Sequence, residues 1–388
     1  MKTRVYFASN RDVIHESSKS GDVFGDRFNA NGPQCFRVGQ ADLRLKGRDP
    51  KDDDAWSVGQ TRLYPETLED GKPRDPKLKL GSASLFEDLR VTLKAEPLDV
   101  IVYLHGFAND FQNAAIRAGQ LQALYGGGAQ KAIVVMFSWP SNGEVQPAWN
   151  YFSDREDAEA SGLAMGRALK RLADFLAEMR AADREAVLAA RRAGGAPDPN
   201  DLVQCTRRLH LVAHSMGNWA LRHAIRKFVE LNGAKAPRIF DNAFLMAADE
   251  DHDALTAPEK LQPLTGLASK VFVYHAANDV ALTISDKTKG LPDRLGADGP
   301  TNLDLADERV YAIDCGRVSK TTLFHGRHQY YRLRDEAIED VRLTLSGAPQ
   351  EGRPGRVTVR EGRSWRLEPA PGAKLAETAP REPERIDR

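Results

Sequence analysis

The chain has 388 residues, of which 41% are hydrophobic and 28% are charged, as expected of a globular protein that buries a large core. Lys and Arg together number 55, as do Asp and Glu, so the charge balance excludes a strongly basic nucleic-acid-binding protein. No apolar run reaches the ~20 residues of a membrane span or forms a signal peptide, and three scattered cysteines disfavour disulfides or zinc, so we expect a cytoplasmic protein.

The first 98 residues are expected to pack on a main domain without forming one of their own. Arg4 to Ser9 is predicted to be a strand. Residues 10–80 are rich in Gly, Asp, Pro and Lys, and only a weak strand signal near Cys35 to Val38 interrupts this irregular segment. Ser84-Leu85-Phe86-Glu87 matches a capping box and predicts a helix that ends at about Lys94.

From residue 99 to 346, apolar strands alternate with helical patterns. The predicted strands are Asp99 to Leu104, Lys131 to Phe137, Leu209 to Ala213, Arg238 to Ala247, Lys270 to His275 and Glu308 to Cys315. The predicted helices are Asp110 to Leu124, Asp154 to about Arg192, Gly217 to Leu231 and Asp335 to Leu345. Strands that are apolar on both faces are typical of a covered parallel sheet. The pattern therefore predicts a doubly wound, mostly parallel α/β sheet flanked by helices.

Two segments lie outside this alternation. Residues 182–205 are expected to be a helical insertion, whose mixed charges favour a solvated surface over a binding face. The tail, residues 347–388, is rich in Pro, Glu, Arg and Gly and is expected to be largely disordered. Within the tail, Val357 to Leu367 has the pattern of a small hairpin.

The stretch Ala213-His214-Ser215-Met216-Gly217 has the form of a nucleophile elbow, a sharp turn between a strand and a helix. Such a turn holds its central residue in a strained conformation and needs small residues two places before and after it. Ala213 and Gly217 meet that need here. On this motif alone, an ordinary turn that contains a serine explains the pattern equally well.

A serine hydroxyl needs a base, most often a histidine held by a carboxylate, and in the α/β-hydrolase order the acid and then the histidine follow the serine. In such sheets these groups lie at the carboxyl ends of strands. Asp279, soon after a predicted strand, is the favoured acid for Ser215, and His328, just before the last helix, is the favoured base. The fallback acid or base residues are Asp249, Asp251 and His325.

The oxyanion of acyl transfer is expected to bind two backbone N–H groups, those of Met216 after the nucleophile and Phe107 in the His-Gly loop. A plain turn at the end of the strand is the alternative reading of that loop. Five residues near these groups are candidates for a substrate pocket: His105, Gly106, Trp139, Tyr151 and His214. Trp139, Tyr151 and Phe107 are equally interpretable as core residues, and a histidine in the position of His214 is usually a structural neighbour of the serine.

With these residues assembled, the chain resembles the α/β-hydrolase superfamily and, more narrowly, a bacterial branch of unknown function. The resembling segments are Val102 to Phe107 with Asp110-Phe111, Phe137 to Ser141, Tyr151 with Asp154, Ala213 to Asn218, Asn278 to Leu282, Arg294 to Gly296, and His328 to Tyr331, with Val5 to Arg11 as a fitting first strand. The resemblance implies the fold and the triad, but a fold of this kind hosts many chemistries and does not indicate the substrate. The segment 182–205 looks longer than the branch pattern, and the tail after Gly347 has no counterpart in it.

The leading hypothesis is a cofactor-independent serine hydrolase, similar to a carboxylesterase, that cleaves a small-molecule ester or thioester through an acyl-enzyme at Ser215. An acyltransferase would use the same triad. A non-catalytic α/β-hydrolase scaffold that binds a protein or small ligand is disfavoured because all three triad residues are present. No metal is expected, since the chain has no HExxH motif and Asp249 to Asp253 reads as a polar loop. The sequence does not indicate an oligomeric state.

Overall fold

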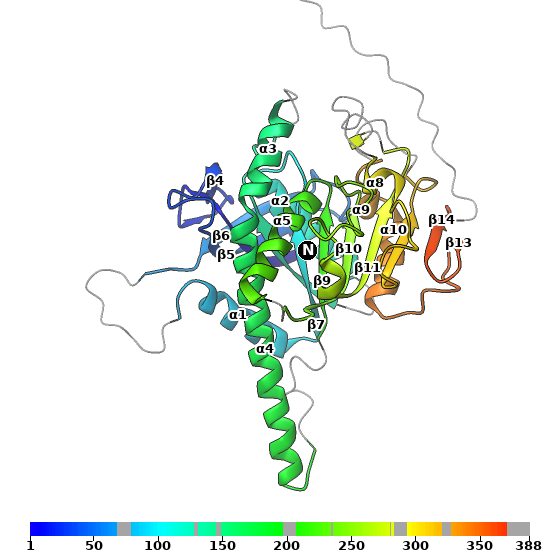
Figure 1. Ribbon diagram of the computed structural model, residues 1–388. Coiled ribbons are helices and arrows are strands. Elements are labelled where there is room, and N and C mark those ends of the chain that lie inside the picture. The colour runs from blue at the N-terminus through cyan, green and yellow to red at the C-terminus, as the bar shows by residue number, and fades with distance from the viewer. Residues whose placement is uncertain are drawn as a thin grey trace, which may run out of the picture.

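A single large sheet lies at the centre of the protein, with helices on both of its faces (Figure 1). The computed structural model describes residues 1–67, 79–127, 131–144, 149–196, 207–233, 236–279, 281–282, 293–319 and 327–370. Within these ranges twelve strands pair in the order β13-β14-β12-β11-β10-β9-β7-β8-β1-β5-β6-β3. The strands are β1 (Lys2–Ser9), β3 (Ser17–Ser18), β5 (Arg37–Leu45), β6 (Trp56–Leu63), β7 (Leu98–Leu104), β8 (Lys131–Ser138), β9 (Leu209–His214), β10 (Phe240–Met246), β11 (Ala268–His275), β12 (Val310–Asp314), β13 (Arg356–Arg360) and β14 (Ser364–Leu367). Two further strands, β2 (Arg11–Val13) and β4 (Phe24–Phe28), pair with each other apart from this sheet.

The middle of the sheet is parallel throughout, from β14 across to β1. The predicted strands of this region agree with the observed ones to within about two residues at each end. Helices connect the parallel strands, as such crossovers require. The prediction of a doubly wound, mostly parallel α/β fold is therefore confirmed.

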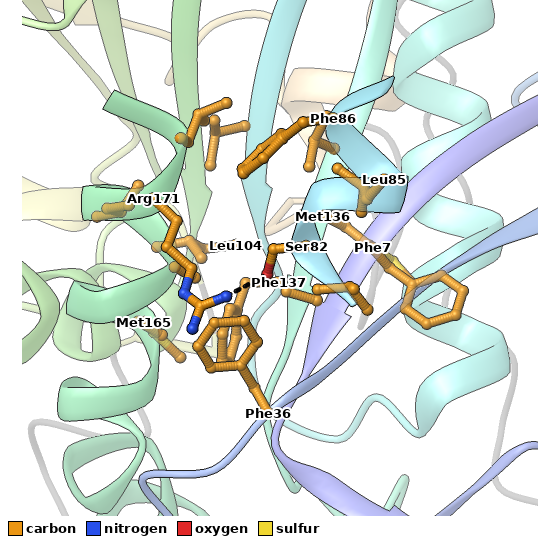
Figure 2. A pocket seen from close by; sticks show the side chains of 17 residues that line it. Phe7, Phe36, Ser82, Leu85, Phe86, Leu104, Met136, Phe137, Met165 and Arg171 are labelled. Atoms are coloured by element: carbon orange, nitrogen blue, oxygen red, sulfur yellow. Dashed lines mark hydrogen bonds between the residues drawn. The ribbon is translucent and has the colours of Figure 1, made fainter. Parts of the chain in front are cut away.

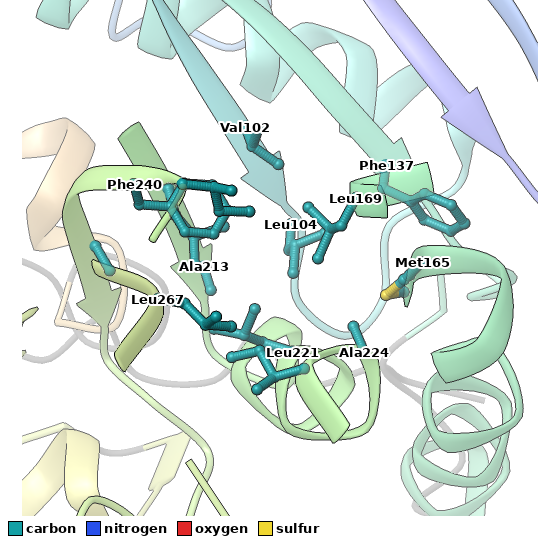
Figure 3. Close-up of a cluster of buried hydrophobic side chains, with 14 of the residues drawn as sticks. Val102, Leu104, Phe137, Met165, Leu169, Ala213, Leu221, Ala224, Phe240 and Leu267 are labelled. Carbon is teal, nitrogen blue, oxygen red and sulfur yellow. The ribbon is translucent and has the colours of Figure 1, made fainter. Parts of the chain in front are cut away.

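The two faces of the sheet carry separate hydrophobic cores. The helices are α1 (Ser82–Ala95), α2 (Phe111–Tyr125), α3 (Trp149–Ala160), α4 (Gly162–Arg192), α5 (Gly217–Asn232), α6 (Leu264–Leu267), α8 (Leu295–Asp298), α9 (Tyr330–Leu333) and α10 (Asp335–Leu345). Along β7, Val102 and Leu104 point to the core under α1, α4 and α5, whereas Tyr103 points to the core under α2, α9 and α10. In the first core, Leu104 lies among side chains of α4 such as Met165 and Leu169 (Figure 3). This alternation explains why the central strands read as continuous apolar runs.

The N-terminal segment is more regular than the sequence predicts. β5 pairs antiparallel with β1 along its whole length, and β6 pairs antiparallel with β5, so both strands extend the main sheet. The prediction of an irregular segment is wrong here, and the weak strand signal near Cys35 to Val38 overlaps the start of β5 at Arg37. Gly39 and Gln40 break the apolar alternation of β5, and a Cβ on Gly39 would lie 2.3 Å from the Arg62 carbonyl oxygen, so partner strands dictate the local sequence.

The start of α1 differs from the prediction of a capping box. The helix begins at Ser82, after Gly81, and no side chain caps it. Instead, the Ser84 hydroxyl donates to the carbonyl oxygen of Lys79 at 2.5 Å, and the Lys79 ammonium pairs with Glu87. Both side chains of the expected box therefore hold the residues that precede the helix.

The long helical pattern after residue 149 is two helices, α3 and α4, with a break at Ser161. The Ser161 hydroxyl donates to the carbonyl oxygen of Asp157 at 2.7 Å and accepts a hydrogen bond from Asn10 at 2.9 Å. α4 ends at Arg192, and its last part projects from the rest of the protein (Figure 1). The expected insertion thus begins as a continuation of α4, and its remaining residues, 197–205, lie outside the described ones.

The hairpin expected in the tail is present as β13 and β14, and it extends the main sheet because β14 pairs in parallel with β12. Trp365 of β14 is buried. The Arg356 guanidinium pairs with Asp340 of α10, with its Nε 2.5 Å from one carboxylate oxygen. The tail is therefore structured as far as residue 370, and residues 371–388 lie outside the described part of the chain. No helix in the described ranges is long and apolar enough to cross a bilayer.

Candidate active site

Ser215 occupies the turn between β9, which ends at His214, and α5, which begins at Gly217. Its φ is 53°, in the left-handed region that a non-glycine residue rarely adopts. A Cβ on Gly217 would lie 2.6 Å from the His105 carbonyl oxygen, and one on Gly106 would lie 2.9 Å from the Ser215 Cβ. The backbones of β9, α5 and the loop after β7 are thus too close for larger residues. This is the geometry expected of a nucleophile elbow.

The structure brings Asp279 and His328 together. Asp279 follows β11, and its Oδ1 accepts hydrogen bonds from the backbone N–H groups of Ala281 at 3.1 Å and Leu282 at 3.3 Å. Its Oδ2 lies 2.7 Å from the Nδ1 of His328. Burial favours the neutral imidazole, but the Asp279 carboxylate, with a smaller contribution from Asp249, raises the pKa of His328 above its usual value near 6.5.

The loop that carries His328 is fixed by residues next to it in the sequence. The Tyr330 hydroxyl donates to the carbonyl oxygen of Tyr274 at 2.6 Å and accepts from the N–H of Ala247 at 3.1 Å. Tyr331 is fully buried, and its carbonyl oxygen accepts a hydrogen bond from Tyr125 at 2.9 Å. These contacts tie His328 to β10, β11 and α2.

His214 connects the elbow to this loop. Its Nε2 lies 3.1 Å from the carbonyl oxygen of His328, and the centroids of the two rings are 4.7 Å apart. Burial lowers the pKa of His214 well below its usual value, so the ring is neutral and its Nε2 donates. The residue before Ser215 therefore contacts both the backbone and the ring of His328. These contacts agree with the interpretation of His214 as a structural neighbour of the serine.

The loop after β7 is held by His105 and Trp139. Their rings stack with centroids 5.0 Å apart, and neither has exposed surface. The Trp139 backbone N–H donates to the Nε2 of His105 at 3.2 Å, and the Nδ1 of His105 lies 2.9 Å from the Gly106 carbonyl oxygen. Burial lowers the pKa of His105 to about 3, so it is neutral at physiological pH. These two pocket candidates are therefore fully buried and pack against each other.

The N–H groups of Phe107 and Met216 are the expected oxyanion donors. Within the described parts of the chain, neither N–H donates a hydrogen bond to a backbone or side-chain acceptor. Met216 is fully buried and Phe107 is half-buried. An N–H without a protein acceptor at a functional edge of the sheet is what an oxyanion site requires.

A family model described as "Alpha/beta hydrolase of unknown function (DUF900)" matches residues 82–188 and 201–341, which together are more than half of the chain. The chain belongs to this family of α/β hydrolases. The matched regions include Ser215, Asp279 and His328. No curated protein and no solved structure matches the chain.

In this α/β hydrolase the fallback acids are engaged elsewhere. Asp249 accepts a hydrogen bond from the Tyr151 hydroxyl at 2.5 Å and lies 3.5 Å from the Nε of Arg294. Asp251 pairs with Lys260 at 3.0 Å and with Arg294 at 3.2 Å. The third fallback residue, His325, lies outside the described residues. No group of three His, Cys, Asp or Glu side chains in the described ranges has the arrangement of a metal site.

The remaining pocket candidate, Tyr151, lies on α3 with its ring edge-on to Phe107 at a centroid distance of 5.7 Å. The same helix turn carries Trp149 and Phe152, whose exposed fractions are 71% and 52%. Trp149 and Phe152 are three residues apart on α3, so their side chains lie on one side of the helix. Trp149 and Phe152 were not among the predicted site residues, because the predicted helix begins only at Asp154.

The role of Arg11, the first residue of β2, was not predicted from the sequence, and its side chain is fully buried. Its guanidinium donates to the hydroxyl of Ser138 and to the carbonyl oxygens of Gly25, Ser141 and Asn109, at 2.7 to 3.2 Å. Asn109 in turn donates to the Phe107 carbonyl oxygen at 2.8 Å. One buried cation thus joins β2 and β4 to the segments that follow β7 and β8, next to the loop that carries Phe107.

Replacement of Arg11 with methionine is expected to lower the free energy of unfolding by about 3 kcal/mol or more, because several buried acceptors lose their donor. Methionine keeps a similar apolar stem and removes the charge. Urea unfolding followed by circular dichroism measures the change. The matched control is Arg44→Met, at an exposed position on β5, which should alter stability by less than about 0.5 kcal/mol. Equal stability of the two variants would contradict this role of Arg11.

Proposed function

We propose that this α/β hydrolase is a serine hydrolase that cleaves a carboxylic ester or thioester through an acyl-enzyme at Ser215. The strongest support is the 2.7 Å contact between Asp279 and His328. The loop of His328 also bonds through its backbone to His214, the residue next to Ser215. The carboxylate fixes the tautomer of the imidazole, so that Nδ1 carries the hydrogen and Nε2 is free to accept the serine proton. No cofactor is needed for this chemistry.

In the proposed mechanism, His328 accepts the proton of the Ser215 hydroxyl as the oxygen attacks the acyl carbonyl carbon. The N–H groups of Phe107 and Met216 stabilise the negative charge on the carbonyl oxygen. His328 then gives its proton to the leaving alcohol or thiol, and the acyl group stays on Ser215. A water molecule, deprotonated by His328, releases the acid and restores the serine.

An apolar acyl or alcohol group is the substrate feature that the surroundings favour. Phe107 and Tyr151 pack edge to face beside the proposed oxyanion donors, and Trp149 and Phe152 lie exposed on the same helix as Tyr151. Apolar surface of this kind stabilises a bound hydrocarbon by about 0.8 kcal/mol per methylene that it buries.

Product analysis with nitrophenyl esters of graded acyl length tests the proposal. We expect turnover that yields the free acid, and a higher kcat/KM for acyl chains longer than acetyl. The same reactions with added alcohol or amine acceptors distinguish hydrolysis from acyl transfer, because a transferase forms the new ester or amide in their presence. A folded protein that turns over no ester or thioester would contradict the proposal and favour a non-catalytic scaffold.

The pH dependence of kcat/KM is expected to follow the protonation of His328. The base must be neutral, so activity is lost as the pH falls through the pKa of His328 in the free enzyme. Because Asp279 and Asp249 raise that pKa, the acidic limb of the profile should lie above pH 6.5. Asp249→Asn removes the smaller of the two contributions and should move the limb to lower pH. An acidic limb below pH 6 would contradict the raised pKa.

A further inference from the structure

A largely apolar pocket, which none of the proposed catalytic residues lines, lies between helices α1 and α4 and strands β1, β5, β7 and β8 (Figure 2). Seventeen residues line it, and all but two of them have hydrocarbon, thioether or aromatic side chains. Its floor includes Val102 and Leu104 of β7, and its wall includes Leu85 and Phe86 of α1. None of the seventeen belongs to the proposed triad or to the oxyanion loop.

The two polar lining residues, Arg171 and Ser82, lie together. The Arg171 guanidinium donates to the Ser82 hydroxyl at 3.0 Å, and its central carbon lies 5.8 Å from the centroid of the Phe36 ring (Figure 2). Arg171 as a whole is exposed, whereas Ser82 is buried. In the part of the chain that the structure describes, Arg171 contacts the Ser82 hydroxyl and the Phe36 ring and forms no ion pair. The pocket thus combines apolar walls with one exposed cation that has no acidic partner there.

The size of the pocket sets the length of hydrocarbon that fits. The volume of the pocket is about 60 Å³. At about 10–15 Å³ for each water-sized group, this is room for roughly four to six groups of that size. A chain with that many carbons in the pocket and its carboxylate carbon at Arg171 has about five to seven carbons in all.

We propose that this pocket binds a fatty carboxylate of about five to seven carbons, with the chain among the apolar side chains and the carboxylate on Arg171. A planar guanidinium matches a carboxylate through two parallel hydrogen bonds, which a surface lysine could not offer. The hydrocarbon chain displaces water from apolar walls, and this transfer favours binding. This site does not depend on the proposed hydrolase activity.

Isothermal titration calorimetry of the full chain with butanoate, hexanoate and octanoate, and with hexanol, tests the proposal. Each added methylene that enters the pocket should tighten binding about threefold to fourfold, until the pocket is full. Hexanoate should bind about tenfold more tightly than hexanol at low salt, because only the carboxylate pairs with Arg171. Equal affinity for hexanoate and hexanol, or no dependence on chain length, would overturn the proposal.

Two variants locate the site. Arg171→Gln should weaken hexanoate binding about tenfold and leave hexanol binding unchanged, whereas the control Arg180→Gln, at an exposed position on the same helix, should change neither. Ala168→Leu places a larger side chain in the pocket and should abolish binding of both ligands, with circular dichroism confirming the fold. Because these positions lie outside the proposed catalytic residues, turnover of nitrophenyl acetate should stay the same in all three variants. Retention of wild-type hexanoate affinity in Arg171→Gln or in folded Ala168→Leu would place the ligand elsewhere and overturn the proposal.

Discussion

Replacement of Ser215 with alanine is expected to lower kcat for ester hydrolysis by roughly 10⁴-fold to 10⁶-fold, to the residual rate that binding and oxyanion stabilisation alone support. The reason is the loss of the only oxygen that can form the proposed acyl-enzyme. The substitution removes one buried hydroxyl oxygen, so the protein should fold, and KM should change little. Steady-state kinetics with the best nitrophenyl ester of the graded series measures the effect.

Ser346→Ala provides the matched control, since Ser346 is an exposed serine at the end of α10 whose hydroxyl caps the Leu343 carbonyl oxygen. It should keep the wild-type kcat. If purified Ser215→Ala retained more than about a tenth of the wild-type activity, Ser215 would not be the nucleophile.

Asp279→Asn is expected to lower kcat by about 10⁴-fold at neutral pH, because an amide that donates to Nδ1 holds the imidazole in the wrong tautomer. The two side chains have nearly the same shape, so the hydrogen bonds from Ala281 and Leu282 to the side-chain oxygen can persist. The substitution should therefore lower kcat strongly, whereas the free energy of unfolding should fall by no more than about 1–3 kcal/mol. Kinetics and urea unfolding of the same preparation separate the two effects.

Asp249→Asn distinguishes the proposed acid from its nearest rival. Asp249 bonds to Tyr151 and pairs with Arg294, and it affects His328 only through its charge. Its replacement should lower kcat by less than about tenfold while it moves the acidic limb of the pH profile. A larger loss from Asp249→Asn than from Asp279→Asn would reverse the assignment of the acid.

The central sheet and the elbow could be predicted from the sequence because their signals are local. β7, β9 and β11 are apolar on both faces, since each contributes to both cores, and the small residues around Ser215 directly reflect the close approach of Gly217 to His105. The pairing of Asp279 with His328 was a hypothesis based on chain order and on the ends of strands. In the structure the two side chains are in hydrogen-bond contact.

Other features were not predictable because they depend on contacts between distant parts of the chain. Gly39 and Gln40 interrupt the apolar pattern of β5. The segment is a strand because it pairs with β1, which lies far earlier in the chain, as in the pair of Val5 with Ala41. Arg11 reads as an ordinary charged residue at the end of a strand, yet it is buried because Ser138 and three carbonyl groups surround it. The pocket between α1 and α4 likewise arises only when Phe36, Ser82 and Arg171 meet.

The family match extends over both sides of the insertion and includes the three residues of the proposed triad. It supports a hydrolase scaffold, and the geometry around Ser215 supports the more specific proposal of a serine nucleophile. The two depend on different observations. If the protein had no esterase activity, the assignment to the α/β-hydrolase family would stand and only the proposed mechanism would be wrong.

Covalent labelling with a fluorophosphonate, followed by mass spectrometry of the proteolytic peptides, tests the central claim most directly. The account predicts one phosphonyl group per chain, on Ser215, and labelling that His328→Ala slows by several orders of magnitude because the serine loses its base. A folded wild-type protein that resists the reagent, or that carries the adduct on a residue other than Ser215, would contradict it.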